Sequence, residues 1–416
     1  MKKMAVLFFL ILSASSVSWA EGVSVSEFLS SAIHDPTLHF QNEKVDFLKG
    51  SSANTPLIRE VEFRGRIDQF KESQQRWGVR ISPNGWGETR SGKRVYNASL
   101  EYNEAQFDLL LHKALKRRYM ALIDYVRVRD LLELNRKLME IAEDRLDIKR
   151  KSVDDLDFDP TALIAAEDDI IELQLDIVDL ENSLGDLEDE IKTAMDADGP
   201  VSLDLDSLID IDAIKRAMEG FRHPPEAENV HIRRAHLSTE LAQCRYSLEK
   251  AQNRRYLSFL QFDYEMDERR DFEEAFLFKF GLIIPVVNPN RLNIDRRKLA
   301  SLREKSDYEN LKREIAGDIV FFLRDLERSI KQYDILLGRK AVSNAESSLE
   351  IFQGIEGTDP LKLLKMKKSM LKTEEASVKM TRRILRKYIN LLDVSGKLSE
   401  RPLKNHLSKT LEPLDL

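Results

Sequence analysis

The residues of this sequence that could do chemistry are mainly acidic, and they gather at two Asp-Pro pairs in distant parts of the chain. The first cluster contains Asp154, Asp155, Asp157, Asp159 and Pro160, and the second contains Glu356, Gly357, Asp359 and Pro360. If several copies of the chain surrounded one axis, these carboxylates would form a ring that favours cations and could bind divalent ions. The plainer interpretation is that the aspartates cap helices beginning at each proline and that the other acidic residues are solvated. The sequence leaves both interpretations open.

No pattern in the sequence predicts catalysis. It contains no recognisable Ser/His/Asp arrangement, phosphate-binding glycine loop or metal motif, so we expect neither an enzyme nor a cofactor. The single cysteine, Cys244, cannot form an internal disulfide. Lys and Arg are spread along a chain of net charge -7, which argues against a nucleic-acid partner.

An internal repeat indicates which elements position the acidic clusters. The segment 77–83 aligns with 280–285, and the two Asp-Pro pairs align with each other. A repeat of this length indicates that one supersecondary unit has been duplicated. We predict a first copy at 21–195 and a second at 227–396, joined by a linker at 196–226 and followed by a polar, partly disordered tail at 397–416.

Each predicted copy contains a helix, two strands and a long helical hairpin. The strands are expected at about 58–69 and 75–83 in the first copy, and at about 257–267 and 274–285 in the second. The helical hairpins are expected at about 97–195, turning at 157–160, and at about 293–396, turning at 354–360. Leucine and isoleucine recur at three- and four-residue spacing along them, which is typical of paired helices. A helix of about 55 residues is roughly 80 Å long, a length that suits a tube or a spacer.

The four strand segments alternate between apolar and polar residues, which predicts one apolar and one polar face. We interpret the apolar face as facing lipid, through Val61, Phe63, Trp77, Val79, Phe262, Tyr264, Phe276, Phe278 and Phe280. The alternative is a pair of amphipathic hairpins packed on a soluble core. Four strands cannot close a barrel, since about eight are the fewest that do so. Strands that cross a membrane would therefore be shared by several chains, and three chains would supply twelve.

The first twenty residues predict a secretory signal peptide. Two lysines precede a short apolar run, and Ser18-Trp19-Ala20 places small residues where a signal peptidase cleaves. Position 21 is Glu rather than Cys, which excludes lipid attachment at a new N-terminal cysteine. No later stretch has 18 consecutive apolar residues. We therefore expect a periplasmic or secreted protein, or one that crosses a membrane as strands.

Taken together, these residues resemble the TolC-like outer-membrane efflux proteins, the outer membrane factor family. The resemblance covers nearly the whole chain after the signal peptide. It rests on the segments 24–38, 280–291, 357–364 and 223–235, in the order and spacing of the family's opening helix, strand-to-helix junction, tip turn and second half. The fold class it implies is mainly α with β, with duplicated helical hairpins in an α-barrel and four strands per chain in a trimeric 12-stranded transmembrane β-barrel.

The resemblance also implies a function. The chain would form a homotrimer in outer-membrane lipid, with most of its mass in the periplasm after cleavage near Ala20. It would be a passive exit duct for efflux or type I-like secretion, coupled to a periplasmic adaptor (membrane fusion) protein and an inner-membrane transporter. The alternative that the residues leave open is a periplasmic coiled-coil adaptor or scaffold of the cell envelope without channel activity.

Overall fold

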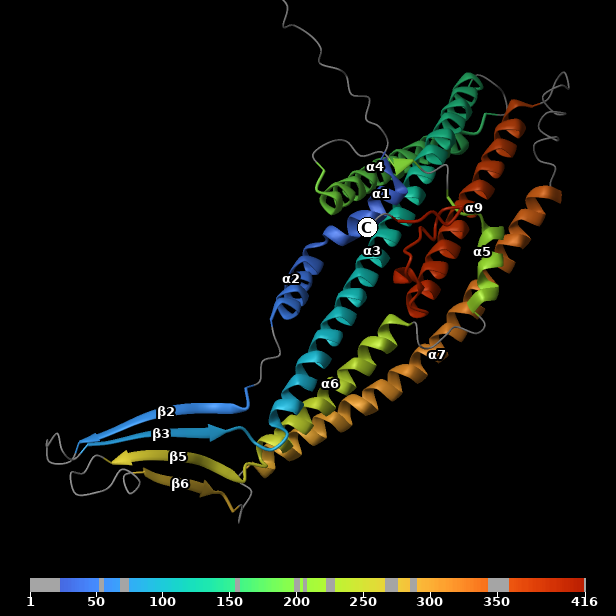
Figure 1. Ribbon diagram of the computed structural model, residues 1–416. Helices are drawn as coiled ribbons and strands as arrows, with labels where there is room; N and C mark the ends of the chain where they lie inside the picture. Colours follow the sequence, from blue (N-terminus) through green and yellow to red (C-terminus); the bar gives the residue numbers. More distant parts are fainter. Residues whose placement is uncertain are drawn as a thin grey trace, which may run out of the picture. The chain divides into compact units, whose positions relative to one another are not determined.

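The computed structural model describes residues 23–51, 56–67, 75–153, 158–197, 203–204, 208–221, 229–265, 276–284, 290–342 and 359–414. The predicted signal peptide therefore lies outside the described residues. Long helices dominate the part that is described (Figure 1). None of these helices combines the length and the apolar composition needed to span a membrane.

Two compact units make up the chain, and each draws on both sequence repeats. The helical unit comprises Met1–Asp35, His112–Pro224 and Asp318–Leu416, and the sheet unit comprises Pro36–Leu111 and Pro225–Gly317. Two long helices, α3 (Glu88–Lys151) and α7 (Arg291–Val342), contribute to both units.

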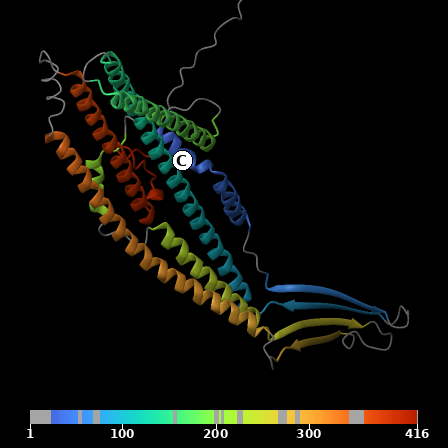
Figure 2. The ribbon, with the colours of Figure 1, turned by 180° about the vertical axis from the view of Figure 1, so that it is seen from behind.

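The sheet unit combines a four-stranded antiparallel sheet with helices (Figures 1 and 2). Besides the first parts of α3 and α7, its described elements are α2 (Pro36–Gly50), β2 (Ile58–Ile67), β3 (Gln75–Pro83), α6 (Val230–Gln252), β5 (Leu257–Glu265) and β6 (Phe276–Leu282). Buried Gln41 of α2 donates to the Asn103 carbonyl of α3 at 2.8 Å. Ser238 of α6 donates to Glu304 of α7 at 2.6 Å. These bonds join the helices of this unit to one another.

The strand order β2-β3-β5-β6 fuses the two sequence repeats into one sheet. The central pair is β3 with β5, in which Val79 lies opposite Phe262. Two hairpins from distant parts of the chain thereby become one sheet, with β2 and β6 at its edges.

Helix α3 begins at Glu88, earlier than the start near 97 expected from the sequence. Glycines at 85, 87 and 92 argued against an earlier start, because glycine is a poor helix former. The Glu88 carboxylate accepts a hydrogen bond from the Gly85 amide at 2.7 Å. Gly87 has a φ of 80°, a left-handed conformation that suits glycine. Gly85 and Gly87 thus shape the turn that leads from β3 into the helix, whereas Gly92 lies within α3.

The helical unit holds the second part of each long helix, their antiparallel partners and several short elements. These are β1 (Val23–Ser24), α1 (Val25–Ser30), η1 (Ser31–His34), α4 (Pro160–Met195), β4 (Leu203–Asp204), α5 (Ile211–Met218), η3 (Glu219–Phe221), α9 (Pro360–Val394) and η6 (Lys397–Ser399). Arg136 of α3 pairs with Glu181 of α4 at 2.8 Å, and Lys387 of α9 pairs with Asp325 of α7 at 2.8 Å. The unit therefore contains two helical hairpins, α3–α4 and α7–α9.

The C-terminal segment corrects the expectation of a partly disordered tail. Its residues up to 414 pack into the helical unit, and Leu398, Leu403 and Leu407 are buried. The Tyr119 hydroxyl of α3 donates to the Lys404 carbonyl and accepts from the His406 amide, each at 3.1 Å. The segment is held against the helical unit by these buried leucines and hydrogen bonds, although its apolar residues follow neither a helical nor a strand period.

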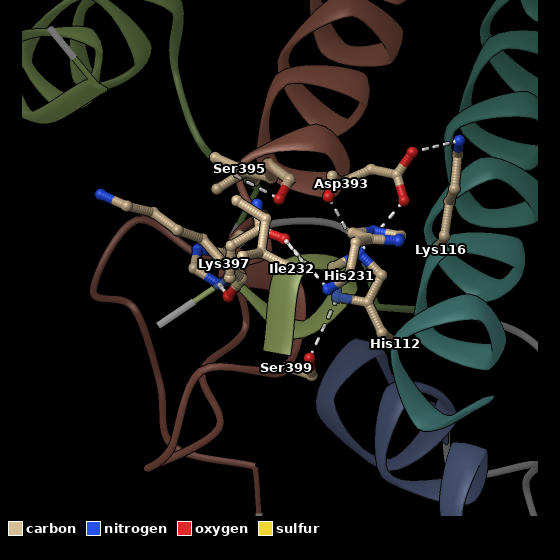
Figure 3. Close-up of polar contacts among 11 residues, drawn as sticks. His112, Lys116, His231, Ile232, Asp393, Ser395, Lys397 and Ser399 are labelled. Atoms are coloured by element: carbon tan, nitrogen blue, oxygen red, sulfur yellow. Dashed lines mark hydrogen bonds and ion pairs between the residues drawn. The ribbon is translucent and has the colours of Figure 1, made fainter. Parts of the chain in front are cut away.

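A buried polar cluster anchors the end of α9 to α3 (Figure 3). The Asp393 carboxylate lies 2.5 Å from the Lys116 ammonium and 3.1 Å from Nε2 of fully buried His112. Nδ1 of His112 lies 3.0 Å from the Ser399 hydroxyl. Burial alone raises the pKa of Asp393, but the hydrogen bonds from His112 and Lys116 outweigh burial and lower the pKa to about 2.

This cluster should make folding stability depend on pH in the acid range. Because the folded-state pKa of Asp393 lies below its unfolded value of about 3.9, its contribution is complete above about pH 5 and is lost as pH falls towards 2. We expect Asp393→Asn to lower the free energy of unfolding at neutral pH by roughly 2–3 kcal/mol and to flatten its dependence between pH 5 and 2. Denaturant titrations followed by circular dichroism would measure both effects.

The matched control is Asp189→Asn, which removes an exposed carboxylate from α4 and should change the unfolding free energy by less than about 0.5 kcal/mol. Parallel pH curves for Asp393→Asn and the parent protein would contradict this account of the cluster.

Candidate functional site

The sheet carries one continuous apolar face. Its central row consists of Phe63, Val79, Phe262 and Phe278, one residue from each strand in register. The nine residues that the sequence interpretation placed towards lipid all lie on this face, in this row and the two beside it: Val61, Phe63, Trp77, Val79, Phe262, Tyr264, Phe276, Phe278 and Phe280.

The aromatic rings on this face contact one another but not a core. The ring centres of Phe262 and Phe278 are 4.9 Å apart, and those of Tyr264 and Phe276 are 5.2 Å apart. Phe63 nevertheless exposes 83% of its surface and Phe262 exposes 53%. Burying one such side chain is worth about 1.5–3 kcal/mol. A whole face of them is therefore unfavourable in water unless something apolar covers it.

The opposite face is polar and internally bonded. Arg80 donates to Gln261 at 2.9 Å, Gln261 donates to Asp263 at 2.6 Å, and Lys279 donates to Asp263 at 2.8 Å. A Cβ at Gly78 would collide with the Asp263 carboxylate, so glycine makes room for this network.

Two further ion pairs lie on the same face. Arg64 pairs with Glu62 at 2.6 Å, and Arg76 pairs with Glu265 at 2.6 Å. Strand alternation identified these side chains as polar-facing. It gave no indication of the bonds between strands, which the sequence analysis missed.

Both edges of the sheet are open in the described part of the chain. No described strand pairs with the outer edge of β2 or of β6. Open edges expose unpaired backbone groups, which invite pairing with another chain in water and are not tolerated in lipid. The described edges of β2 and β6 are therefore available for pairing with further strands.

The acidic clusters are only partly within the described residues. Asp159 caps α4 by accepting from the Thr161 amide at 2.9 Å, and Asp359 caps α9 by accepting from the Leu361 amide at 2.9 Å. Pro160 and Pro360 are the first residues of these helices. Hydrogen bonds from Thr161 lower the pKa of Asp159. Capping thus accounts for two of the acidic residues. The others in the predicted turns, Asp154, Asp155, Asp157, Glu356 and Gly357, lie outside the described residues.

The helices carry a second exposed apolar surface that the sequence analysis did not single out. On α4, four exposed side chains form a stripe at helical spacing: Ile164, Ile171, Leu175 and Val178. The helix also has eleven acidic residues and one lysine, whereas α9 has ten basic residues and three acidic ones. The exposed side of α4 is therefore apolar and strongly negative. Counting exposed positions on each helix would have been needed to find it.

Comparison with solved structures places this fold among outer-membrane channels. The outer membrane protein VceC of Vibrio cholerae superimposes with a TM-score of 0.66 at 12% identity, over 89% of this chain and 96% of VceC. The open-state MtrE outer membrane channel of Neisseria gonorrhoeae matches with a TM-score of 0.65 at 14% identity, over 94% and 91%. The CmeC outer membrane channel of Campylobacter jejuni matches with a TM-score of 0.61 at 10% identity, over 93% and 86%.

No protein-family model and no curated protein sequence matches the chain. The likeness to these solved structures is one of fold, at 10–14% identity. It nevertheless extends over about nine tenths of both partners in these alignments. The predicted fold class of long duplicated helical hairpins with four strands is confirmed, and the chain has the fold of the TolC-like outer-membrane channels that its sequence resembles.

Proposed function

We propose that this chain is one subunit of a homotrimeric exit duct in the outer membrane. The observation that carries the proposal is the sheet, with its exposed aromatic face, its bonded polar face and its two open edges. That combination suits a segment of barrel wall with lipid on one side and water on the other.

Three is the smallest number of copies that would pair both edges of the sheet and also leave a channel. Four strands are too few to close a barrel, whereas twelve exceed the eight or so that would enclose only side chains. In such a barrel, β6 of one copy would pair with β2 of the next. Both open edges disappear, and every aromatic residue of the apolar face reaches lipid.

The helices support assembly by a second route. The exposed α4 stripe and the carboxylates around it would be complemented by a surface that offers apolar and basic side chains. Helix α9 is basic: Lys368 pairs with Asp169 of α4 within the chain at 2.9 Å, and Lys362, Lys365 and Lys372 in its first half are exposed. We propose that α4 of one copy packs against α9 of the next, so that the helical hairpins close into a tube.

The duct would be passive and would export solutes or proteins by efflux or type I-like secretion. In this proposal a periplasmic adaptor and an inner-membrane transporter engage the ends of the helical hairpins and supply the energy. The acidic residues before Pro160 and Pro360 would then surround the periplasmic opening. The signal peptide would bring the chain to the periplasm, from which the sheet inserts into the outer membrane.

The face assignment predicts opposite results for one charge placed on two neighbouring residues. Phe278→Arg places a cation on the proposed lipid face, at a cost of roughly 2–4 kcal/mol per chain near the middle of the bilayer. Leu277→Arg places the same cation on the polar face, where water would solvate it. We expect Phe278→Arg to abolish membrane-inserted trimer and Leu277→Arg to retain it, as judged by heat-modifiable migration of outer-membrane extracts. Equal assembly of the two variants would refute the proposed orientation of the sheet.

The proposed helix contact predicts that a charge in the α4 stripe weakens the trimer. Leu175→Glu should reduce association by roughly 10- to 100-fold, because it replaces about 1.5–3 kcal/mol of apolar burial with a carboxylate. Gln174→Glu adds the same charge to an adjacent exposed position and is the control. Native mass spectrometry of detergent-solubilised protein would count the subunits. Identical trimer fractions for the two variants would place the α4 stripe outside the interface.

The acidic turn predicts cation preference at the periplasmic opening. Changing Asp154, Asp155, Asp157 and Asp159 together to Asn removes the charge and keeps a capping side chain at 159. We expect the ratio of cation to anion permeability, measured from reversal potentials in planar bilayers, to fall in this variant. Asp159→Asn alone should change it least. An unchanged ratio in the fourfold variant would leave these residues with capping and solvation only.

A further inference from the structure

Arg80, on the polar face of the sheet, differs from three of the cations around it. Arg64, Arg76 and Lys279 each form an ion pair with a carboxylate of the sheet. In the described part of the chain, no carboxylate lies within ion-pair distance of the Arg80 guanidinium. The guanidinium instead contacts a neutral amide and an aromatic ring.

Those two contacts hold Arg80 in place without neutralising it. Nε donates to Gln261 at 2.9 Å, and the guanidinium carbon lies 4.1 Å from the centre of the Phe259 ring. The ring in turn covers Gly281, where a Cβ would lie only 2.6 Å from it. A guanidinium stacked on an aromatic ring keeps its full charge and is more weakly hydrated than an ammonium. Arg80 is therefore positioned to meet an anion.

The surrounding network leaves this charge uncompensated. Arg80, Gln261, Asp263 and Lys279 form one bonded chain with two cations and one carboxylate. The carboxylate is buried and is bonded to Lys279 and Gln261, so it does not offset Arg80 directly. Glu62 lies opposite Arg80 in register, but its carboxylate pairs with Arg64, so this pair adds no net charge. Each copy thus presents one net positive charge at the middle rows of the sheet.

We infer that three Arg80 side chains form an anion-attracting ring inside the barrel, so that the duct favours anionic solutes at this level. The inference rests on the proposed trimeric barrel, which turns the polar face inward and repeats Arg80 by symmetry. Rings of Arg or Lys are the usual means by which a pore favours anions. A purely structural role for Arg80 would require its sheet contacts but not its charge.

A cysteine reporter on the same face can measure the local potential. Leu277 lies opposite Asp263 in the row next to that of Arg80 and is 44% exposed. In a Cys244→Ser background, Leu277→Cys would be treated with sulfonatoethyl or trimethylammonioethyl methanethiosulfonate, reagents of similar size and opposite charge. The ratio of the two reaction rates reports the potential at the sheet, independently of any selectivity at the acidic turns.

Removing the charge of Arg80 should shift this ratio. We expect Arg80→Gln to lower the anionic-to-cationic rate ratio by roughly fivefold, from Coulomb interactions over about 10 Å with salt screening. Arg80→Lys should keep most of the parent ratio. An unchanged ratio in assembled Arg80→Gln trimers would overturn the inference.

Two controls separate this inference from the proposed function. Phe276→Cys lies on the opposite face and should react slowly with both charged reagents if that face meets lipid. Reaction as fast as at Leu277→Cys would overturn the barrel itself. If Arg80→Gln does not assemble, the salt dependence of the ratio in the reporter protein decides the matter. The ratio should fall as the Debye length shortens from about 30 Å at 0.01 M to about 3 Å at 1 M, and a constant ratio would overturn the anion preference.

Discussion

A sheet with one apolar face, one charged face and two open edges is unfavourable for a single chain both in water alone and in lipid alone. Water penalises the aromatic face, whereas lipid penalises the charged face and the unpaired backbone of both edges. Closure with other copies removes these penalties together, because it pairs the edges and separates the two faces into lipid and water. The other parts of the proposed assembly follow from this requirement, since a shared barrel brings the helices of neighbouring copies side by side.

Charged side chains have different roles in the helical unit and in the sheet unit. In the helical unit, paired charges such as Lys387 with Asp325 join helices within the chain. The opposite net charges of α4 and α9 suit both their ion pair within the chain, Lys368 with Asp169, and the proposed contact between copies. In the sheet unit, Gly78 makes room for Asp263, and the resulting network fixes Lys279 and Gln261 but leaves Arg80 without a carboxylate. The same residue types thus hold the fold together in one place and, in the proposed barrel, would present a field to solutes in another.

Much of this architecture could be predicted from the sequence, because the signals were periodic. Period-two alternation placed Phe63, Val79, Phe262 and Phe278 on one face, and the register sets them side by side in one row. The Asp-Pro pairs predicted where α4 and α9 begin, since aspartate caps a helix and proline suits its first position.

The features that the sequence did not predict depend on contacts between distant residues. Pairing of β3 with β5 has no local signal, and neither has the bond from Arg80 to Gln261. The C-terminal segment looked disordered because its leucines follow no period, yet Leu403 and Leu407 are buried against residues far away in the chain. Glycines obscured the start of α3 because they are poor helix formers, yet Gly87 and the bond from Gly85 to Glu88 form the turn that leads into the helix.

The most direct test of the central claim is to find the native protein and count its subunits. Native membranes would be separated on a density gradient, and the detergent extract of the fraction containing the protein would be weighed by native mass spectrometry. The account predicts the outer-membrane fraction and a mass of three processed chains. Release with the soluble periplasmic proteins, or a monomeric mass, would contradict the shared barrel and favour a periplasmic scaffold instead.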